Sequence, residues 1–167
     1  MFRTMRRFRQ QLPESEVIEI LERNADGVLS VIGDDGYPYG VPVNYVYADG
    51  KIWFHAAVSG HKKDAMERND KVCFTVVDTH DVIPEARATH YRSVIAFGRA
   101  RFLEDPAEKR AALQVFGYKH SADYRQEVDE EIRTDFSRTL AVEITIEHMT
   151  GKESKDLMLL RENTPAS

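Results

Sequence analysis

The chain has 167 residues, of which 42% are hydrophobic and 31% are charged, and its formal net charge is −5. This length suits one domain with a hydrophobic core of its own, and no apolar run approaches the roughly 20 residues that cross a bilayer. The acidic balance argues against the broad basic face of a nucleic-acid-binding protein. The single cysteine, Cys73, has no internal disulfide partner and favours a reducing compartment. We therefore expect one cytoplasmic domain over residues 1–167, with no nucleic-acid or membrane partner.

The N-terminal third begins with a basic arm over residues 1–12, which lacks the apolar stretch of a signal peptide. We expect this arm to be flexible or to contact a second subunit. Pro13, acidic residues after it and apolar residues at helical spacing predict a helix over 14–24. β-type patterns with turn signals, including Asp49-Gly50, follow. The strands predicted in this part are residues 28–32, 41–47 and 51–55.

The rest of the chain alternates predicted strands with predicted helices. A strand over 71–77 is followed by a loop over 78–90, which contains Pro84, and by a long strand near 91–103. Asp105-Pro106-Ala107-Glu108 has the pattern of a capped helix start, so a helix is expected to about Phe116. A second helix over 121–134 and a last strand over 140–147 complete the series. About six antiparallel strands with helices between them indicate a mainly β fold, a β-barrel with inserted helices.

An anion site is indicated after the strand 51–55. Ser59 as N-cap and Gly60 behind it predict a helix start with free backbone N–H groups, and Lys62 and Lys63 lie in its first turn. Cations there oppose the helix dipole, so a bound phosphate would account for them. The alternative is a solvated helix face. The strand 51–55 would bring His55 beside this helix start.

Other polar residues lie within the predicted strands, and each has two readings. Asn44 is either a hydrogen-bonded core amide or a ligand contact, and Arg92 and Ser93 are either structural or ligand-binding. Pro42 donates no hydrogen bond, which predicts that its strand is an edge strand or is bulged. Trp53 is expected in the core or an interface.

The common catalytic templates are absent. Six histidines include no zinc-binding pair at helical spacing, and the chain has no nucleophile elbow around Ser93 and no glycine-rich nucleotide fingerprint. We therefore expect no metal, and we assign no catalytic residue. This combination favours a protein whose cofactor supplies the chemistry.

Several motifs occur in an order and spacing that cover nearly the whole chain. They are Arg6-Arg7; Asp35-Gly36-Tyr37-Pro38-Tyr39; Val41-Pro42-Val43-Asn44-Tyr45-Val46-Tyr47; Asp49-Gly50-Lys51-Ile52-Trp53-Phe54-His55; Gly60-His61-Lys62; Asn69 to Phe74; Tyr91-Arg92-Ser93-Val94-Ile95-Ala96-Phe97-Gly98-Arg99-Ala100; and Thr150-Gly151-Lys152-Glu153-Ser154. On these motifs the chain resembles the pyridoxamine-phosphate-oxidase-like FMN-binding split-barrel superfamily, and more closely its nitroimidazole-resistance branch.

The resemblance implies a homodimer of split barrels with FMN at the subunit interface. By position, His55, His61 and Lys62 would grip the FMN phosphate, although relatives commonly carry Lys or Arg in place of His61. The remaining contacts would surround the phosphate and the isoalloxazine. The complete cofactor-binding set that the resemblance implies is Val43, Asn44, His55, Ser59, Gly60, His61, Lys62, Arg92 and Ser93.

The resemblance also implies an activity: an FMN-dependent oxidoreductase that takes electrons from NAD(P)H and reduces a small acceptor such as a nitro-aromatic. The alternatives are a non-catalytic flavin-binding or redox-sensing protein and a haem-binding split barrel, and a deazaflavin is an alternative cofactor. A pyridoxamine-phosphate oxidase proper is disfavoured, because the sequence shows no second phosphate site for its substrate.

Overall fold

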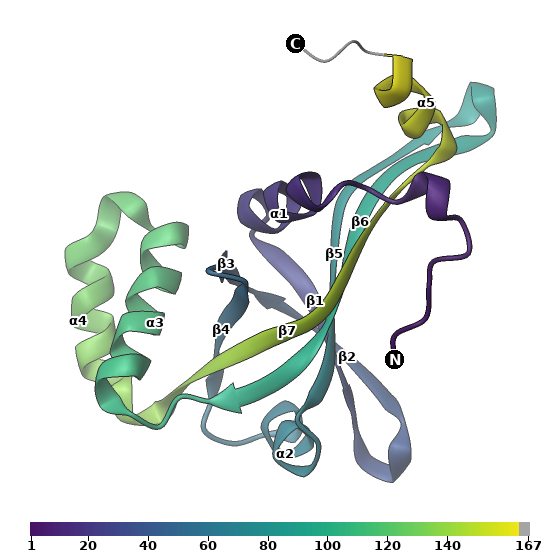
Figure 1. Cartoon of the computed structure of the whole chain (residues 1–167). Coiled ribbons are helices and arrows are strands. Elements are labelled where there is room, and N and C mark those ends of the chain that lie inside the picture. The colour runs from purple at the N-terminus through teal and green to yellow at the C-terminus, as the bar shows by residue number, and fades with distance from the viewer. Residues whose placement is uncertain (164–167) are drawn as a thin grey trace.

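The computed structural model describes residues 1–163, which fold around one antiparallel sheet of seven strands (Figure 1). The strands are β1 (Asp26–Ile32), β2 (Pro38–Asn44), β3 (Val46–Ala48), β4 (Lys51–Ala57), β5 (Lys71–Ile83), β6 (Ala88–Phe102) and β7 (Thr139–Glu153). The helices are α1 (Glu14–Arg23), α2 (His61–Arg68), α3 (Pro106–His120), α4 (Arg125–Asp135) and α5 (Lys155–Asn163). Short 3-10 turns are η1 (Phe8–Gln10), η2 (Asp34–Gly36), η3 (Pro84–Ala86), η4 (Ala122–Tyr124) and η5 (Phe136–Arg138). None of the helices described is both long and apolar enough to cross a membrane.

The strand order explains why the sheet rolls up. It is β2-β1-β5-β6-β7-β4-β3, so the two edge strands are consecutive in the chain and only Tyr45 separates them. A link of one residue brings the two edges together, which curls the sheet into a split barrel. Tyr45 is fully buried at this link, where its hydroxyl donates to the Leu21 carbonyl at 2.8 Å and its N–H donates to the Ala25 carbonyl at 3.0 Å. The predicted mainly β fold, a barrel with inserted helices, is confirmed.

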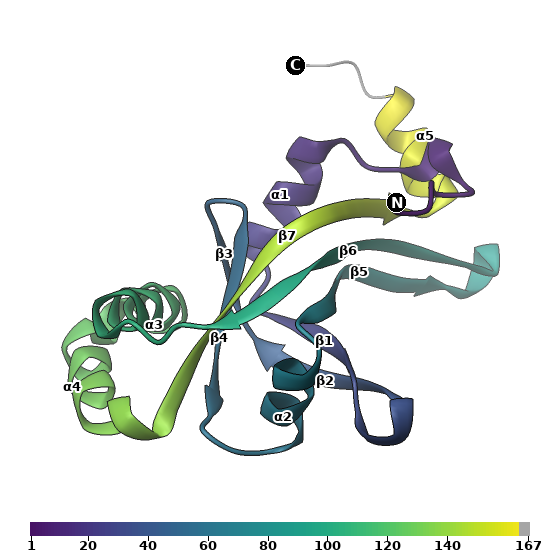
Figure 2. The same cartoon turned by 60° about the horizontal axis from the view of Figure 1, so that its bottom comes forward.

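The barrel core is built from alternate residues of the strands. Leu29, Phe74, Val94 and Val142 are each fully buried. Successive side chains of a strand point to opposite faces of the sheet, and one of these faces points into the barrel. A second, smaller core lies outside the barrel, where α3 and α4 lie side by side and cover part of β7 (Figures 1 and 2). Asp105 caps α3 as predicted, since its carboxylate accepts from the N–H groups of Ala107 and Glu108.

Three predictions about elements were wrong. The segment 78–90 is not a loop, because β5 and β6 continue through it as a paired hairpin and Pro84 only begins the short turn η3 at its tip. The predicted strand 41–47 is two strands, β2 and β3, broken at Tyr45. The last strand runs on to Glu153, where the N-terminal arm joins it through a bridge between Gln11 and Lys152. Any contact of the arm with a second subunit stays a prediction.

Candidate functional site

The start of α2 has the open backbone that an anion site requires. Gly60 precedes the helix with a φ of 125°, a conformation that favours glycine, and a Cβ built there would meet nothing within 4 Å. The first N–H groups of an α-helix have no partner within the helix. The prediction that Ser59 is the N-cap was wrong, since Gly60 occupies that position and no side chain caps the helix. These N–H groups therefore have no competing side-chain cap.

Two of the predicted phosphate ligands, His55 and Lys62, lie close together beside this helix start. Burial lowers the pKa of His55, the positive charge of Lys62 lowers it further, and Glu131 opposes both effects. Burial also lowers the pKa of Lys62. By contrast, Lys63 forms an ion pair with Glu67 at 2.7 Å. A bound anion would favour the charged forms of His55 and Lys62, so the pair is suited to one.

His61 lies on the other side of the helix start. Its ring stacks on Tyr39 with 4.2 Å between centroids, and its Nε2 accepts from the N–H of Asp34 at 3.2 Å. The same nitrogen also lies 3.6 Å from Asp34 Oδ2. His61 is thus bound to the turn between β1 and β2. We call the start of α2 together with His55 and Lys62 the anion seat, and these two side chains are its cationic groups.

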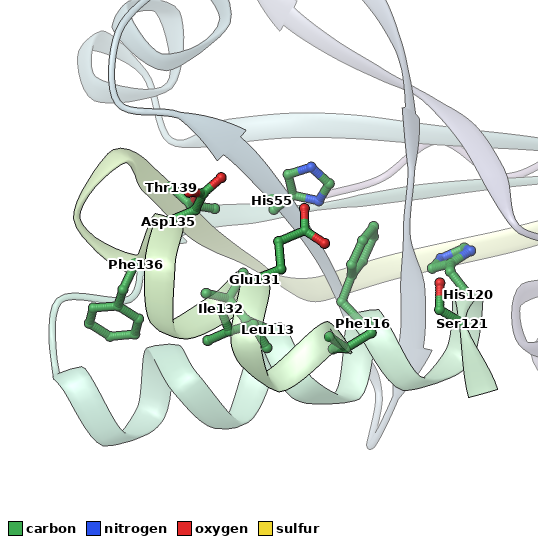
Figure 3. Close-up of a pocket in the computed structure, with 12 residues that line it drawn as sticks. His55, Leu113, Phe116, His120, Ser121, Glu131, Ile132, Asp135, Phe136 and Thr139 are labelled. Carbon is green, nitrogen blue, oxygen red and sulfur yellow. The ribbon is translucent and has the colours of Figure 1, made fainter. Parts of the chain in front are cut away.

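A cavity of about 270 Å³ opens beside His55, between β4 and the α3–α4 pair (Figure 3). Three rings line it in series: His55 meets Phe116 edge-on at 4.7 Å, and Phe116 meets His120 at 4.7 Å. Glu131 points its carboxylate toward His55 from α4 (Figure 3). The other lining residues are Leu113, Gly117, Ser121, Val128, Ile132, Asp135, Phe136 and Thr139. The cavity therefore combines an aromatic wall with hydrogen-bonding groups.

The tautomer of His120 follows from its contact with the link residue Tyr45. His120 Nε2 lies 3.0 Å from the Tyr45 carbonyl oxygen, which only accepts, so Nε2 must carry the proton. The Nδ1 atom of a neutral His120 is then an acceptor. Sequence reasoning missed Phe116, His120 and Glu131, because no local pattern indicates that helices more than 50 residues downstream cover His55.

The remaining predicted residues form a second group, in which Asn44 and Ser93 lie on the outer face of the sheet, whereas Val43 and Arg92 lie on the opposite face of the same strands. Asn44 pairs with Asp26 on β1, and Ser93 pairs with Val77 on β5 and with Lys152 on β7. The register between β1 and β5 places Asp26 level with Val77, so Asn44 and Ser93 lie on one row across the sheet. Three strand spacings of about 4.8 Å separate them by about 14 Å. Asn44 also donates to the Ala25 carbonyl at 3.3 Å. Val43, beside it, packs partly into the core.

Arg92 contributes an unsatisfied donor to this second group. Its Nη2 lies 3.5 Å from Glu153 Oε2, whereas its Nε is buried and has no hydrogen-bond partner among the described residues. Glu153 is fully buried and is held mainly by Arg161, at 2.7 Å. A buried donor without a partner is costly, so the Arg92 Nε is suited to a ligand acceptor.

A single chain does not bring all nine predicted cofactor residues together. His55, Gly60, His61 and Lys62 lie around the start of α2, where Ser59 immediately precedes it. Asn44 sits at the opposite end of the β1–β2 ladder from the turn that His61 contacts. Within residues 1–163, no three His, Cys, Asp or Glu side chains gather closely enough to hold a metal ion.

The comparison with protein families decides the chain's relationship. Residues 13–153 match the family model described as pyridoxamine 5'-phosphate oxidase. The chain belongs to the pyridoxamine 5'-phosphate oxidase family. The match covers the whole barrel and both groups of candidate residues, and it confirms the resemblance drawn from the motifs. No curated protein matches the chain in sequence.

Solved structures of this family's fold are similar over most of the chain. A candidate 5-nitroimidazole antibiotic resistance protein from Bacteroides thetaiotaomicron is 23% identical, with a TM-score of 0.70 and 86% of each chain covered. A conserved hypothetical protein from Mycobacterium tuberculosis is 20% identical, with a TM-score of 0.74, and the match covers 98% of this chain and 96% of that one. An FAD and haem binding protein from Mycobacterium smegmatis is 16% identical, with a TM-score of 0.75, and the match covers 93% and 81%. These similarities establish the fold.

Proposed function

We propose that this member of the family is a flavin-dependent oxidoreductase that binds FMN, takes electrons from NAD(P)H and passes them to a small acceptor such as a nitro-aromatic. The observation that carries the proposal is the anion seat at the start of α2, where an open glycine backbone meets the half-buried cation Lys62 and the imidazole of His55. FAD is the alternative flavin, because the similar protein from Mycobacterium smegmatis is an FAD and haem binding protein.

The two groups of residues would hold different parts of the flavin. Lys62, His55 and the backbone after Gly60 would bind the phosphate, since the first N–H groups of α2 have no side-chain cap and Lys62 lies in that first turn. The Ser93 hydroxyl and the Asn44 amide, which share the outer face of the sheet, would hydrogen-bond the polar edge of the ring system, whereas Arg92 lies on the opposite face beside Glu153. When bound, a flavin supplies hydride and electron transfer, whereas the protein supplies position and polarity.

The cavity beside His55 is the place that we propose for the acceptor. Its aromatic wall, Phe116, would pack against a flat ring, and the imidazole of His120 would provide a hydrogen bond. The covering helices α3 and α4 would keep bulk water away from this space.

We also propose that the protein is a homodimer whose second subunit completes each site. The outer face of the sheet exposes large apolar side chains on adjacent strands, which are Val28, Ile32, Val77, Ile95 and Phe97. Exposed apolar side chains gathered on one face of a sheet are typical of an interaction surface. Asn44 and Ser93 lie on the same face and are distant from α2 of their own chain. A second copy bound to this face would bring its own α2 toward them.

Two lysines of the same turn provide the test, because Lys62 acts on His55 by its charge, whereas Lys63 is paired with a carboxylate. We expect Lys62→Ala to weaken flavin binding at least about tenfold, since a charged hydrogen bond contributes about 1.5–3 kcal/mol. Lys63→Ala should retain flavin, because Lys63 is paired with Glu67. The measurement is flavin content after gel filtration, with the mass from light scattering to show that the assembly persists. Full flavin content in both Lys62→Ala and His55→Ala would contradict the phosphate site.

Reduction tests separate this proposal from a non-catalytic flavin-binding or redox-sensing role. Anaerobic addition of NADH or NADPH should bleach the flavin absorbance of a reductase, and reoxidation by a nitro-aromatic should restore it. Absence of bleaching with either donor would favour storage or sensing instead. A haem titration that produces a Soret band in the flavin-free protein would favour the haem-binding alternative.

A further inference from the structure

The N-terminal arm and α5 lie together at the other end of the molecule from α4 (Figure 1). Residues of these two segments line a second hollow, of about 460 Å³. Its lining includes four cationic side chains, from Arg6, Arg7, Arg9 and Lys155, and no carboxylate. Phe8 and Met158 contribute apolar surface. None of these residues belongs to the candidate flavin site. This local concentration of positive charge contrasts with the net charge of −5 of the whole chain.

The charges of this cationic hollow are not neutralised within the chain. Among the described residues, Arg6, Arg9 and Lys155 have no ion pair, and Arg7 reaches only the Gln10 side-chain oxygen, at 3.4 Å. Arginines elsewhere commonly have a carboxylate partner within 3 Å. Examples are Arg23, Arg68, Arg99, Arg101, Arg138 and Arg161. Like charges gathered without partners repel one another, and a bound anion would remove that cost.

The walls of the cationic hollow are held in place by hydrogen bonds. The N–H of Gln10 donates to the Arg7 carbonyl at 3.0 Å, which closes the turn that carries the arginines. The Gln10 side chain donates to the Glu153 carbonyl at 3.1 Å, at the end of β7. The Glu153 carboxylate accepts from Arg161 of α5 at 2.7 Å. The turn that carries the arginines and the helix that carries Lys155 are therefore both held to the same buried residue.

We propose that this hollow binds a phosphorylated small molecule that carries an aromatic ring, of the nucleoside diphosphate class. Guanidinium groups match phosphate oxygens in charge and in geometry. Phe8 is 68% exposed at the hollow and offers a free face on which a ring can stack. The net charge of −5 favours a compact anion over an extended polyanion such as a nucleic acid.

The test uses two probes on the flavin-saturated protein, so that the α2 seat is already filled. Isothermal titration at low ionic strength should detect binding of inorganic pyrophosphate and of ADP. Arg6→Gln/Arg9→Gln should weaken both probes at least about tenfold, because each guanidinium makes charged hydrogen bonds to phosphate. Phe8→Leu should weaken ADP about fivefold or more and leave pyrophosphate within about twofold, because only ADP has a ring to stack.

The matched control is Arg133→Gln/Arg138→Gln, which removes two charges from the far end of the molecule, in and after α4. It should leave both probes unchanged. Binding of neither probe at millimolar concentration would overturn the proposal, and so would binding that the Arg6→Gln/Arg9→Gln change leaves intact. A loss of dimer mass in that variant would also overturn it, since the arginines would then hold a second copy. Flavin content is measured in parallel and should not change, so the flavin proposal and this one can fail separately.

Discussion

Glu143 provides a quantitative test of how the outer side of the barrel is stabilised. Its side chain is buried on β7, where it accepts from Arg101 at 2.8 Å, Lys51 at 2.9 Å and the Trp53 indole at 3.1 Å. Burial alone would raise the pKa of Glu143, but these hydrogen bonds outweigh it and lower the pKa from 4.5 to about 2. The ionised form is therefore the one that the fold stabilises.

The size of this stabilisation follows from linkage. A fall in pKa from 4.5 to about 2, at about 1.36 kcal/mol per unit, corresponds to about 3 kcal/mol of folding free energy. Because the folded-state pKa is the lower one, this contribution is present above pH 4.5 and is lost as the pH falls toward 2. We expect Glu143→Gln to lose about 3 kcal/mol at pH 7 and progressively less below pH 4.5.

The assay is urea unfolding followed by the fluorescence of Trp53, the single tryptophan, at pH 7 and at pH 3. Glu147→Gln is the control, because the Glu147 side chain is 41% exposed and its ion pair with Arg99 is on the surface. This control should change the free energy of unfolding far less. If Glu143→Gln lowered stability equally at both pH values, the loss would come from packing and not from charge, and the linkage argument would be refuted.

Three further substitutions test the fold. Tyr45→Phe should cost about 1–2 kcal/mol, measured by urea unfolding, because it leaves the Leu21 carbonyl without its buried donor; an unchanged midpoint would contradict this. Gly98→Ala should lower the free energy of unfolding by about 2–3 kcal/mol, because a Cβ there would lie 2.3 Å from the Thr145 carbonyl oxygen. A variant as stable as the parent would show that β6 and β7 can move apart without cost at this point. Asp105→Ala should cost about 1 kcal/mol through loss of the helix cap, and thermal unfolding with no shift would refute that role.

The sequence predicted the elements whose signals are local. Pro13 with its following acids marked α1, Asp105 marked the start of α3, and Asp49-Gly50 marked the turn between β3 and β4. Pro42 was predicted to lie on an edge or bulged strand, and β2 is an edge of the sheet. These signals act within a few residues, so they can be interpreted without knowing what packs against them.

The errors arose where tertiary structure overrides a local signal. Pro84 suggested a long loop, but pairing between β5 and β6 extends to Ile83 and Ala88 and leaves the proline at the tip. Tyr45 looked like part of a continuous strand, because its role as the link between the two edges depends on the whole sheet order. The cationic hollow depends on α5, an element that the sequence did not predict, so the arginines of the arm could not be placed.

The candidate site was predicted only in part, for a related reason. The helix start near Gly60 and its neighbours His55 and Lys62 are close in sequence, and the structure brings them together. Phe116 and His120 reach His55 only because α3 folds back over β4, which no local pattern encodes.

The central claim is that the chain binds a flavin, and the most direct measurement is an absorbance spectrum of the freshly purified protein, with the released chromophore identified by mass. We expect the bands of an oxidised flavin at about one molecule per chain, with FMN or FAD released on denaturation. A colourless protein that takes up neither FMN nor FAD would contradict the claim, and the anion seat at α2 would then belong to another phosphorylated ligand.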